Sequence, residues 1–230
     1  MDLDTLIQLD RQLLLAVNGS PSLYLDILVR TLTTAVTWVP LYVALFVLVL
    51  KNNESFLRIL FIIGCAALCV ILAGTIDDTI VKPLVGRWRP THDPQIGAAV
   101  DIVDGYRGGR FGFFSAHACN TFSIAVFFSL LVRSRLLTIF LVTWSLVNCW
   151  TRLYLGVHFP GDILVGLFWG GLVGFGVYGL FRYVTRRHLT ATSYISTKYT
   201  VSGYRHSDIN IVLVVLMLTY VYALLRACII

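Results

Sequence analysis

A series of long apolar stretches separated by short polar connections constrains this chain more than any other feature. A helix needs about 20 mostly apolar residues to cross the hydrocarbon core of a bilayer. The two middle stretches are short, and we expect them to extend into the flanking segments SAHACN and NCWTRLYL. The pattern predicts an all-α, polytopic transmembrane helix bundle of about six spans. The predicted spans lie at about residues 31–50, 56–76, 118–132, 136–151, 161–181 and 209–229.

The composition favours a membrane protein over a soluble domain. Of the 230 residues, 57% are hydrophobic and 13% are charged, and the mean hydropathy is +0.80. A soluble domain has about 25% charged residues. One small globule cannot bury this apolar surplus, so much of it should face lipid. We predict one integral-membrane domain over residues 1–230, with a motif core at 77–170, a cytoplasmic loop at 182–208 and the last span at 209–229.

The segment before the first span has the pattern of an amphipathic helix. Apolar residues recur at helical spacing between Leu6 and Val17, and Asp10 and Arg11 fall on the other side. A helix of this kind lies in the membrane interface with its apolar face toward the lipid. We therefore predict an N-terminal interfacial helix that ends at the Asn-Gly-Ser-Pro sequence of residues 18–21.

The distribution of Lys and Arg predicts the orientation of the bundle. The connections on one side, at 51–58, 133–135 and 182–208, carry nine of the eighteen Lys and Arg residues. By the positive-inside rule this side is cytoplasmic. The opposite side holds the other nine, mostly in the loop 77–116 and the turn 152–161. These cations need a purpose other than topology.

Charge and cysteine usage argue against two other classes of protein. The net charge of +6 suits cytoplasmic loops and acidic lipid headgroups, and no aromatic–basic recognition motif accompanies it, so we expect no nucleic-acid partner. Cys65 and Cys69 share a helix face, but no histidine or further cysteine accompanies them as a zinc site would need. We interpret the five cysteines as small core residues and predict neither a metal nor another cofactor.

The first cation cluster is KPLVGRWRP, residues 82–90. Pro83 and Pro90 disfavour a helical conformation for the residues before them, Lys82 and Arg89. Both cations are therefore expected on kinked or irregular backbone at the membrane edge. Interfacial anchoring, with Trp88 in an aromatic belt, is the alternative reading of this segment taken alone.

The second segment of interest is GFFSAHACNTF, residues 112–122. Ser115 is placed to cap a helix that continues into the third span, and a helix N-terminus with free N–H groups binds anions. His117 falls in the first turn of that helix. Read alone, a histidine satisfied at the interface explains the segment equally well.

The third segment is TRLYLGVHFPGD, residues 151–162. His158 and Asp162 are four residues apart, so the carboxylate can accept a hydrogen bond from one ring nitrogen and leave the other free as a nucleophile or base. Arg152 stands at the end of the preceding span, and charges this close to a bilayer are costly and usually functional.

All three segments fall on the same predicted side of the membrane. Together they supply several cations, a capped helix N-terminus and two histidines, one of which has a carboxylate partner. This set suits phosphoryl transfer, in which cations and N–H groups hold the phosphate oxygens, one histidine attacks phosphorus and the other protonates the leaving oxygen.

At this point the sequence resembles the type 2 phosphatidic acid phosphatases, which share their site with the vanadium haloperoxidases. That family has three ordered motifs: Lys, six residues, Arg-Pro; then Pro-Ser-Gly-His; then Ser-Arg, five residues, His, three residues, Asp. The corresponding segments here are Lys82-PLVGRW-Arg89-Pro90, Phe114-Ser115-Ala116-His117 and Thr151-Arg152-LYLGV-His158-FPG-Asp162.

The sequence departs from the family pattern at three positions. Phe114 and Ala116 stand where the family has proline and glycine, which leaves the backbone around Ser115 less free to wrap a phosphate. Thr151 stands for a serine and keeps the hydroxyl.

The resemblance implies a role for each matching residue. His158 would be the nucleophile that forms a phosphohistidine, with Asp162 orienting it, and His117 would be the general acid. The phosphoryl oxygens would be bound by Lys82, Arg89, Arg152, Ser115 and the backbone near Ala116. No metal is implied.

Arg107 and Arg110 lie in the loop between the first two motifs. They are candidates for binding a second phosphate or a sugar headgroup, and anchoring to lipid headgroups is an equal alternative. For Asp77 and Asp78 we favour structural ion pairing with nearby cations over catalysis.

The resulting hypothesis is a metal-independent lipid phosphatase in a bacterial inner membrane, with its site facing the periplasm. The resemblance favours a lipid A phosphate or undecaprenyl diphosphate as the substrate taken from the bilayer. A phosphatidylglycerophosphate or phosphatidate phosphatase and a lipid phosphotransferase stay open as alternatives. A transporter would have polar residues at mid-bilayer and repeated halves, and the sequence has neither. The sequence does not indicate an oligomeric state.

Overall fold

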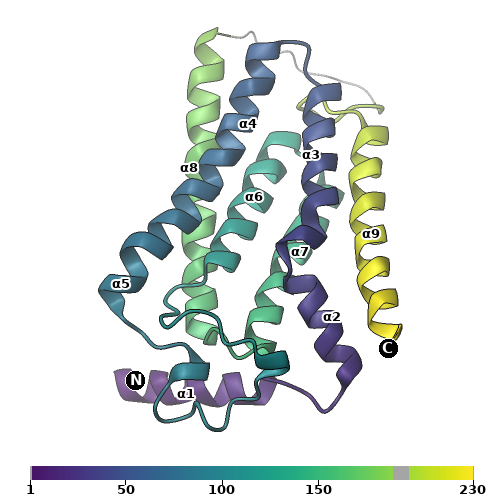
Figure 1. Cartoon of the computed structure of the whole chain (residues 1–230). Coiled ribbons are helices and arrows are strands. Elements are labelled where there is room, and N and C mark those ends of the chain that lie inside the picture. Colours follow the sequence, from purple (N-terminus) through teal and green to yellow (C-terminus); the bar gives the residue numbers. More distant parts are fainter. Residues whose placement is uncertain (1, 189–196, 230) are drawn as a thin grey trace.

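The computed structural model describes residues 2–188 and 197–229, which form helices and connecting loops without a β-sheet. Figure 1 shows long helices that run roughly side by side, with the N-terminal helix lying across one end. The α-helices are α1 (Leu3–Val17), α2 (Leu23–Thr33), α3 (Val39–Lys51), α4 (Phe56–Val70), α5 (Lys82–Val85), α6 (Ala116–Val132), α7 (Arg135–Tyr154), α8 (Pro160–His188) and α9 (His206–Cys228).

The helix lengths confirm the predicted all-α, polytopic membrane fold. Among the described residues, four helical segments are long and apolar enough to cross a bilayer: Phe56–Val85, Arg135–Tyr154, Pro160–Thr185 and His206–Cys228. The bent pair Leu23–Thr33 and Ala35–Lys51 adds a fifth if it counts as one span. Helix α6 is apolar but only 17 residues long, and it packs against α4, α7 and α8. Length therefore supports four to five spans, and the predicted count of about six is not established.

The first predicted span, 31–50, covers only part of what the structure contains. Helix α2 begins at Leu23, and the chain bends by 66° before α3. The sequence did not indicate α2 because Asp26 and Arg30 interrupt its apolar run. Both are used locally: Asp26 accepts a hydrogen bond from the Tyr154 hydroxyl at 2.7 Å, and Arg30 lies 3.5 Å from Asp104.

The second predicted span, 56–76, ends too early. The helix continues to Val85 through two π-helical segments, Ile71–Thr75 and Asp77–Val81. Lys82 is therefore helical, but its N–H donates to the Asp77 carbonyl and closes the π-helical segment, so it lies at an irregular point of the helix rather than in a loop. Pro83 has no N–H to donate to the preceding turn, and the wider π-helical turn lies directly before it. Arg89 does lie on extended backbone, as expected.

The segment 182–208, predicted as a loop, begins as helix. Helix α8 extends to His188, and residues 189–196 lie outside the described residues. Arginine is a good helix former, and its long side chain can carry the charge away from lipid, so the basic residues after Phe181 need not end the helix.

The three connections predicted to share one side do meet at one end of the bundle. Lys51 forms an ion pair with Asp208 at 2.7 Å, and the Ser202 hydroxyl donates to the Val132 carbonyl at 2.6 Å. These contacts join the α3–α4, α6–α7 and α8–α9 connections. The other end carries α1 and the loop between α5 and α6 (Figure 1).

Helix α1 has its polar face against the protein. Asp10 and Arg11 contact the loop after α5 and the start of α8, whereas Leu6, Leu9 and Leu13 remain 47%, 43% and 48% exposed. The helix ends at Val17, as predicted. Its outward apolar face fits the predicted position at a membrane surface, which remains a prediction.

Close packing of α6 on α8 sets the distance between the two helix starts. A Cβ added to Gly170 would lie 2.5 Å from the Cys119 carbonyl oxygen, and one on Gly166 would lie 2.9 Å from that of Ser115. Small residues four apart allow helices in a membrane to approach this closely. The N-termini of α6 and α8 consequently meet at the same end of the bundle.

Candidate active site

The turn before α8 places His158 and Asp162 of the third motif. Gly156 permits the turn because its φ is +63°, and an added Cβ would lie 2.4 Å from Val100. Asp162 then caps α8, since its Oδ2 accepts the Phe159 N–H at 3.0 Å, as the third residue of a helix does in a capping box. The Ser115 N–H donates to the Asp162 carbonyl at 3.1 Å, which ties the second motif to the third.

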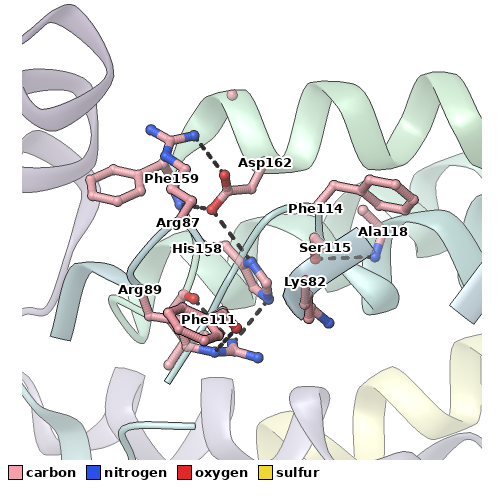
Figure 2. Close-up of polar contacts among 12 residues, drawn as sticks. Lys82, Arg87, Arg89, Phe111, Phe114, Ser115, Ala118, His158, Phe159 and Asp162 are labelled. Carbon is pink, nitrogen blue, oxygen red and sulfur yellow. Dashed lines mark hydrogen bonds and ion pairs between the residues drawn. The ribbon is translucent and has the colours of Figure 1, made fainter. Parts of the chain in front are cut away.

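His158 is 1% exposed and lies between a carboxylate and a guanidinium (Figure 2). Its Nδ1 is 3.6 Å from Asp162 Oδ2, and its Nε2 is 3.1 Å from Arg89 Nη1. Burial lowers the pKa of His158 well below its usual 6.5, and Arg89 and Arg152 lower it further. The ring is therefore neutral at neutral pH, so one nitrogen can act as a nucleophile or base.

Two buried arginines in the site have no carboxylate partner among the described residues. Arg89, 9% exposed, donates to the carbonyls of Phe111 and Val157, each at 3.1 Å. Arg152, 2% exposed, donates to the hydroxyls of Thr33 at 2.5 Å and Tyr106 at 3.1 Å. Burial lowers the pKa of Arg89, and the Arg152 charge lowers it further. Two uncompensated cations in a buried site create a strong preference for an anion.

Lys82 comes to the site from the end of the second spanning helix. It forms ion pairs with Asp77, at 2.8 Å, and with Asp78. Asp77 is fully buried and also accepts the Phe114 N–H at 3.1 Å, so the lysine and the second motif are joined through one carboxylate. The structure thus bears out ion pairing for both aspartates.

The second motif supplies the predicted helix N-terminus. The Ser115 hydroxyl accepts the Ala118 N–H at 3.4 Å and caps α6, and Ala116 and His117 form the first turn. His117 lies near enough to Arg152, Arg89 and Lys82 for their charges to lower its pKa, and it is near the backbone of Thr33. His117 is also near enough to His158 for its charge to lower the pKa of His158.

Arg107 and Arg110 are exposed on the loop that passes over Arg89. The Arg110 guanidinium stacks 4.4 Å from the Trp88 ring, and a Cβ at Gly108 would lie 3.1 Å from Arg89 Nη1. Both side chains are at the rim of the site, outside the buried cluster.

Sequence reasoning missed several residues that shape the site. Arg87, inside the first motif, donates to Asp162 Oδ1 at 2.6 Å and pairs with Asp10 of α1. The Tyr106 hydroxyl lies against Arg152, and although burial raises its pKa, Arg152, Arg89 and Arg30 lower it, so the net pKa falls below its usual value. The two residues of each of these pairs are dozens of positions apart in the sequence, so no local pattern predicts the contact.

In the described part of the chain, no group of three or more His, Cys, Asp or Glu side chains is arranged so that it could hold a metal ion. The carboxylates nearest the site are already paired with Lys82 and Arg87.

Comparison with known proteins gives consistent matches. Residues 57–186 match the PAP2 superfamily. The chain is 39% identical to a lipid A 4'-phosphatase of Bacteroides thetaiotaomicron over 80% of this chain and 82% of that protein. It is 35% identical to a lipid A 4'-phosphatase of Porphyromonas gingivalis, over 83% and 80% respectively. A decaprenylphosphoryl-5-phosphoribose phosphatase of Mycobacterium tuberculosis is 34% identical over 41% of this chain and 48% of its own. No solved structure matches.

Proposed function

Because the chain belongs to the PAP2 superfamily, we propose that this integral-membrane lipid phosphatase removes the 4'-phosphate of lipid A. The reaction needs no metal, passes through a phosphohistidine and takes place on the periplasmic face of a bacterial inner membrane. Two relatives of matching length carry that activity in their names, at 39% and 35% identity. The distribution of Lys and Arg supports the orientation once the cations of the site are assigned to phosphate binding, because the two sides otherwise carry nine each.

One observation carries the proposal: Arg89 and Arg152 are buried beside His158 without a carboxylate partner in the described residues. A phosphate placed between them would compensate both charges. It would also lie at the N-terminus of α6, where free N–H groups and the helix dipole favour an anion.

The arrangement supports a two-step reaction. In the first step, His158 Nε2 attacks phosphorus while Asp162 holds the Nδ1–H side of the ring. The P–O bond to the lipid breaks, and His117 donates a proton to the departing oxygen. Burial and the charges of Arg152, Arg89 and Lys82 lower the pKa of His117 in the free enzyme to about 3, so His117 takes up this proton once the bound phosphate offsets those charges. In the second step, His117 takes a proton from water, which attacks the phosphohistidine and releases inorganic phosphate and free His158. Arg89, Arg152 and Lys82 offset the charge on the phosphoryl oxygens throughout.

The lipid chains have a place beside this site. A groove of about 1160 Å³ runs between α2 and α9, with apolar walls that include Ile27, Leu218 and Leu225. Arg30 lines the groove and lies 4.7 Å from the Tyr106 ring, whose hydroxyl contacts Arg152. One aromatic ring thus separates the groove from a buried phosphate-binding arginine. We assign the acyl chains of the substrate to this groove.

The function is tested by measuring phosphate release from lipid A by the detergent-purified protein with EDTA present. Wild type should release phosphate, His158→Ala should not, and His206→Ala, an exposed histidine at the other end of the bundle, should match wild type. Equal release by wild type and His158→Ala, or loss of activity with EDTA, would refute the mechanism. Rapid quenching should trap a phosphoenzyme in wild type alone.

A substrate panel decides among the alternatives. The proposed substrate changes if the enzyme hydrolyses another lipid with a higher kcat/KM than lipid A. The panel contains undecaprenyl diphosphate, phosphatidylglycerophosphate and phosphatidate. A phosphotransferase would release little phosphate until an acceptor lipid is added. For the groove, Leu218→Trp should lower kcat/KM for lipid A but not for a water-soluble phosphate ester. Leu224→Trp, an exposed position on α9 that does not line the groove, is the control.

A further inference from the structure

Two arginines of the first motif reach opposite ends of the His158–Asp162 pair. Residues 87–89 run antiparallel to 110–112, since the Arg89 N–H donates to the Arg110 carbonyl at 3.1 Å and the Gly112 N–H donates to the Arg87 carbonyl at 2.9 Å. Side chains two apart on an extended segment project to the same side. Arg89 therefore meets His158 Nε2, while Arg87 meets Asp162 Oδ1 at 2.6 Å (Figure 2).

Arg87 is held in a way that does not suit phosphate binding. One end of its guanidinium pairs with Asp162 and the other with Asp10, and its centre lies 4.4 Å from the Phe159 ring. Lys82 is paired with two carboxylates as well, so the pairing alone does not set Arg87 apart from the phosphate-binding cations, but its position does. Its contacts lie on the Asp162 side of the pair, away from the nitrogen of His158 that faces Arg89.

Asp10 links this arginine to the N-terminal helix. Its carboxylate pairs with Arg87 and also accepts the Gly161 N–H at 2.7 Å, in the turn that leads to Asp162. Helix α1 lies outside the residues that match the family, 57–186. A segment beyond the matched region thus contacts the support of the site twice through one side chain.

We propose that Arg87 is a positioning residue that keeps the Asp162 carboxylate ionised and oriented toward His158, and that Asp10 of α1 holds Arg87 in place. This inference rests on the proposed function, because it assigns Asp162 the task of orienting a nucleophilic His158. Helix α1 is thus connected to the site through side chains in the order Asp10, Arg87, Asp162 and His158. It helps to position the site as well as lying at the surface.

Kinetics of Arg87→Gln, Arg87→Lys and Asp10→Asn test this. Residues that orient the ligands of a metal site are a comparable case, and their loss typically costs about 10–100-fold. Arg87→Gln should lose kcat by a factor in that range and slow phosphoenzyme formation equally, with KM and inhibition by inorganic phosphate unchanged. Arg87→Lys should recover part of the loss, and Asp10→Asn should lose less. In the Arg87→Gln background, Asp10→Asn should add nothing, because both act through the same contact.

Arg11→Gln is the matched control. Arg11 neighbours Asp10 on α1 and anchors the helix through Asp93 at 3.0 Å, without contacting Arg87 or Asp162. It should leave kcat near wild type. An equal kcat loss in Arg11→Gln and Asp10→Asn would mean that α1 matters only by docking, and weaker inhibition by phosphate in Arg87→Gln would mean that Arg87 binds substrate. Either result overturns the proposal.

Two further choices keep the outcomes distinct. If Arg87→Gln does not fold, as judged by its thermal unfolding in detergent, Arg87→Lys and Asp10→Asn carry the test. If wild type does not hydrolyse lipid A, the proposed substrate fails, and the same variants are compared on whichever phosphate ester wild type does hydrolyse.

Discussion

The two histidines of the site are held by different kinds of force. His158 lies in a loop, and charged side chains from separate segments surround it: Arg89, Asp162 and, behind the carboxylate, Arg87. His117 lies in the first turn of α6, where the close packing of α6 on α8 sets its position.

The difference shows that charge interactions position one histidine, whereas helix packing positions the other. Buried ion pairs are strong only when their geometry is complete, so removing one partner disturbs the others. Helix packing depends on volume, so it tolerates changes of charge nearby but not an added methyl group at a close contact. Substitutions that change charge should therefore impair the half of the site with His158, and substitutions that change volume should impair the half with His117.

The largest effect that separates the halves is expected from His117→Ala with two substrates. General acid catalysis contributes about 10²–10⁴-fold when the leaving group is a poor one. His117→Ala should slow phosphoenzyme formation by a factor in that range with a lipid sugar phosphate but should keep a near wild-type burst of p-nitrophenol from p-nitrophenyl phosphate, whose leaving group needs no proton. Later turnover should be slow with either substrate, because His117 also activates the water. His158→Ala should lose activity on both substrates. A His117→Ala enzyme in which phosphoenzyme formation is slowed equally with both substrates would contradict the role of His117 as the acid.

Packing is probed by Gly170→Ala. The new Cβ would lie 2.5 Å from the Cys119 carbonyl oxygen, and overpacking of this kind costs about 1–3 kcal/mol. We expect lower thermal stability in detergent, with His117 displaced from the site and kcat reduced. Gly179→Ala is the matched control on the same helix, because nothing lies within 4 Å of its added Cβ. Equal stability of the two variants would show that the α6–α8 contact is soft.

The sequence predicted the parts of this comparison that local patterns encode. Apolar runs predicted the helices, and the motif spacings placed His158 four residues before Asp162 and Ser115 at a helix start. Ser115 does cap α6, and the Asp162 carboxylate does face His158, but its Oδ2 lies 3.6 Å from Nδ1, beyond hydrogen-bond distance. The roles assigned to these residues remain predictions.

Contacts between distant segments could not be predicted from the sequence. Arg87 and Asp162 are 75 residues apart, Arg87 and Asp10 are 77 apart, and Arg152 and Thr33 are 119 apart. The motif spacing identified Arg89, but nothing in the residues near Arg87 indicated that it pairs with Asp162 and Asp10. Only the three-dimensional path of the chain gives one a carboxylate and leaves the other free for an anion.

The pH dependence of kcat/KM tests the electrostatic environment of His158. Burial, Arg89, Arg152, Lys82 and the nearby His117 all lower the pKa of His158 below 6.5. Activity should therefore persist as the pH falls through 6.5, and the acid limb due to His158 should lie below it. The unfolded chain takes up this proton first, so the folded state also loses stability as the pH falls below 6.5.

Two controls assign that acid limb. Enzyme held at low pH and returned to neutral pH should recover full activity if unfolding is not the cause. Phosphate esters with different second pKa values separate titration of the substrate from that of the enzyme. An acid limb centred above pH 6.5 with every ester would contradict a neutral His158 in the free enzyme.

The smallest effect is expected from Ala116→Gly, at the position where the sequence departs from the family pattern. Ala116 is the first residue of α6, directly after the Ser115 cap. Glycine costs about 1 kcal/mol relative to alanine within a helix, and less at a helix end where few backbone hydrogen bonds depend on it. The N–H groups that face an anion are already set by the helix, so added backbone freedom should change KM and kcat by less than about threefold, or roughly 0.65 kcal/mol. A tenfold gain in activity would instead mean that alanine holds the backbone away from the phosphate, and that this half of the site is limited by backbone geometry rather than by helix packing.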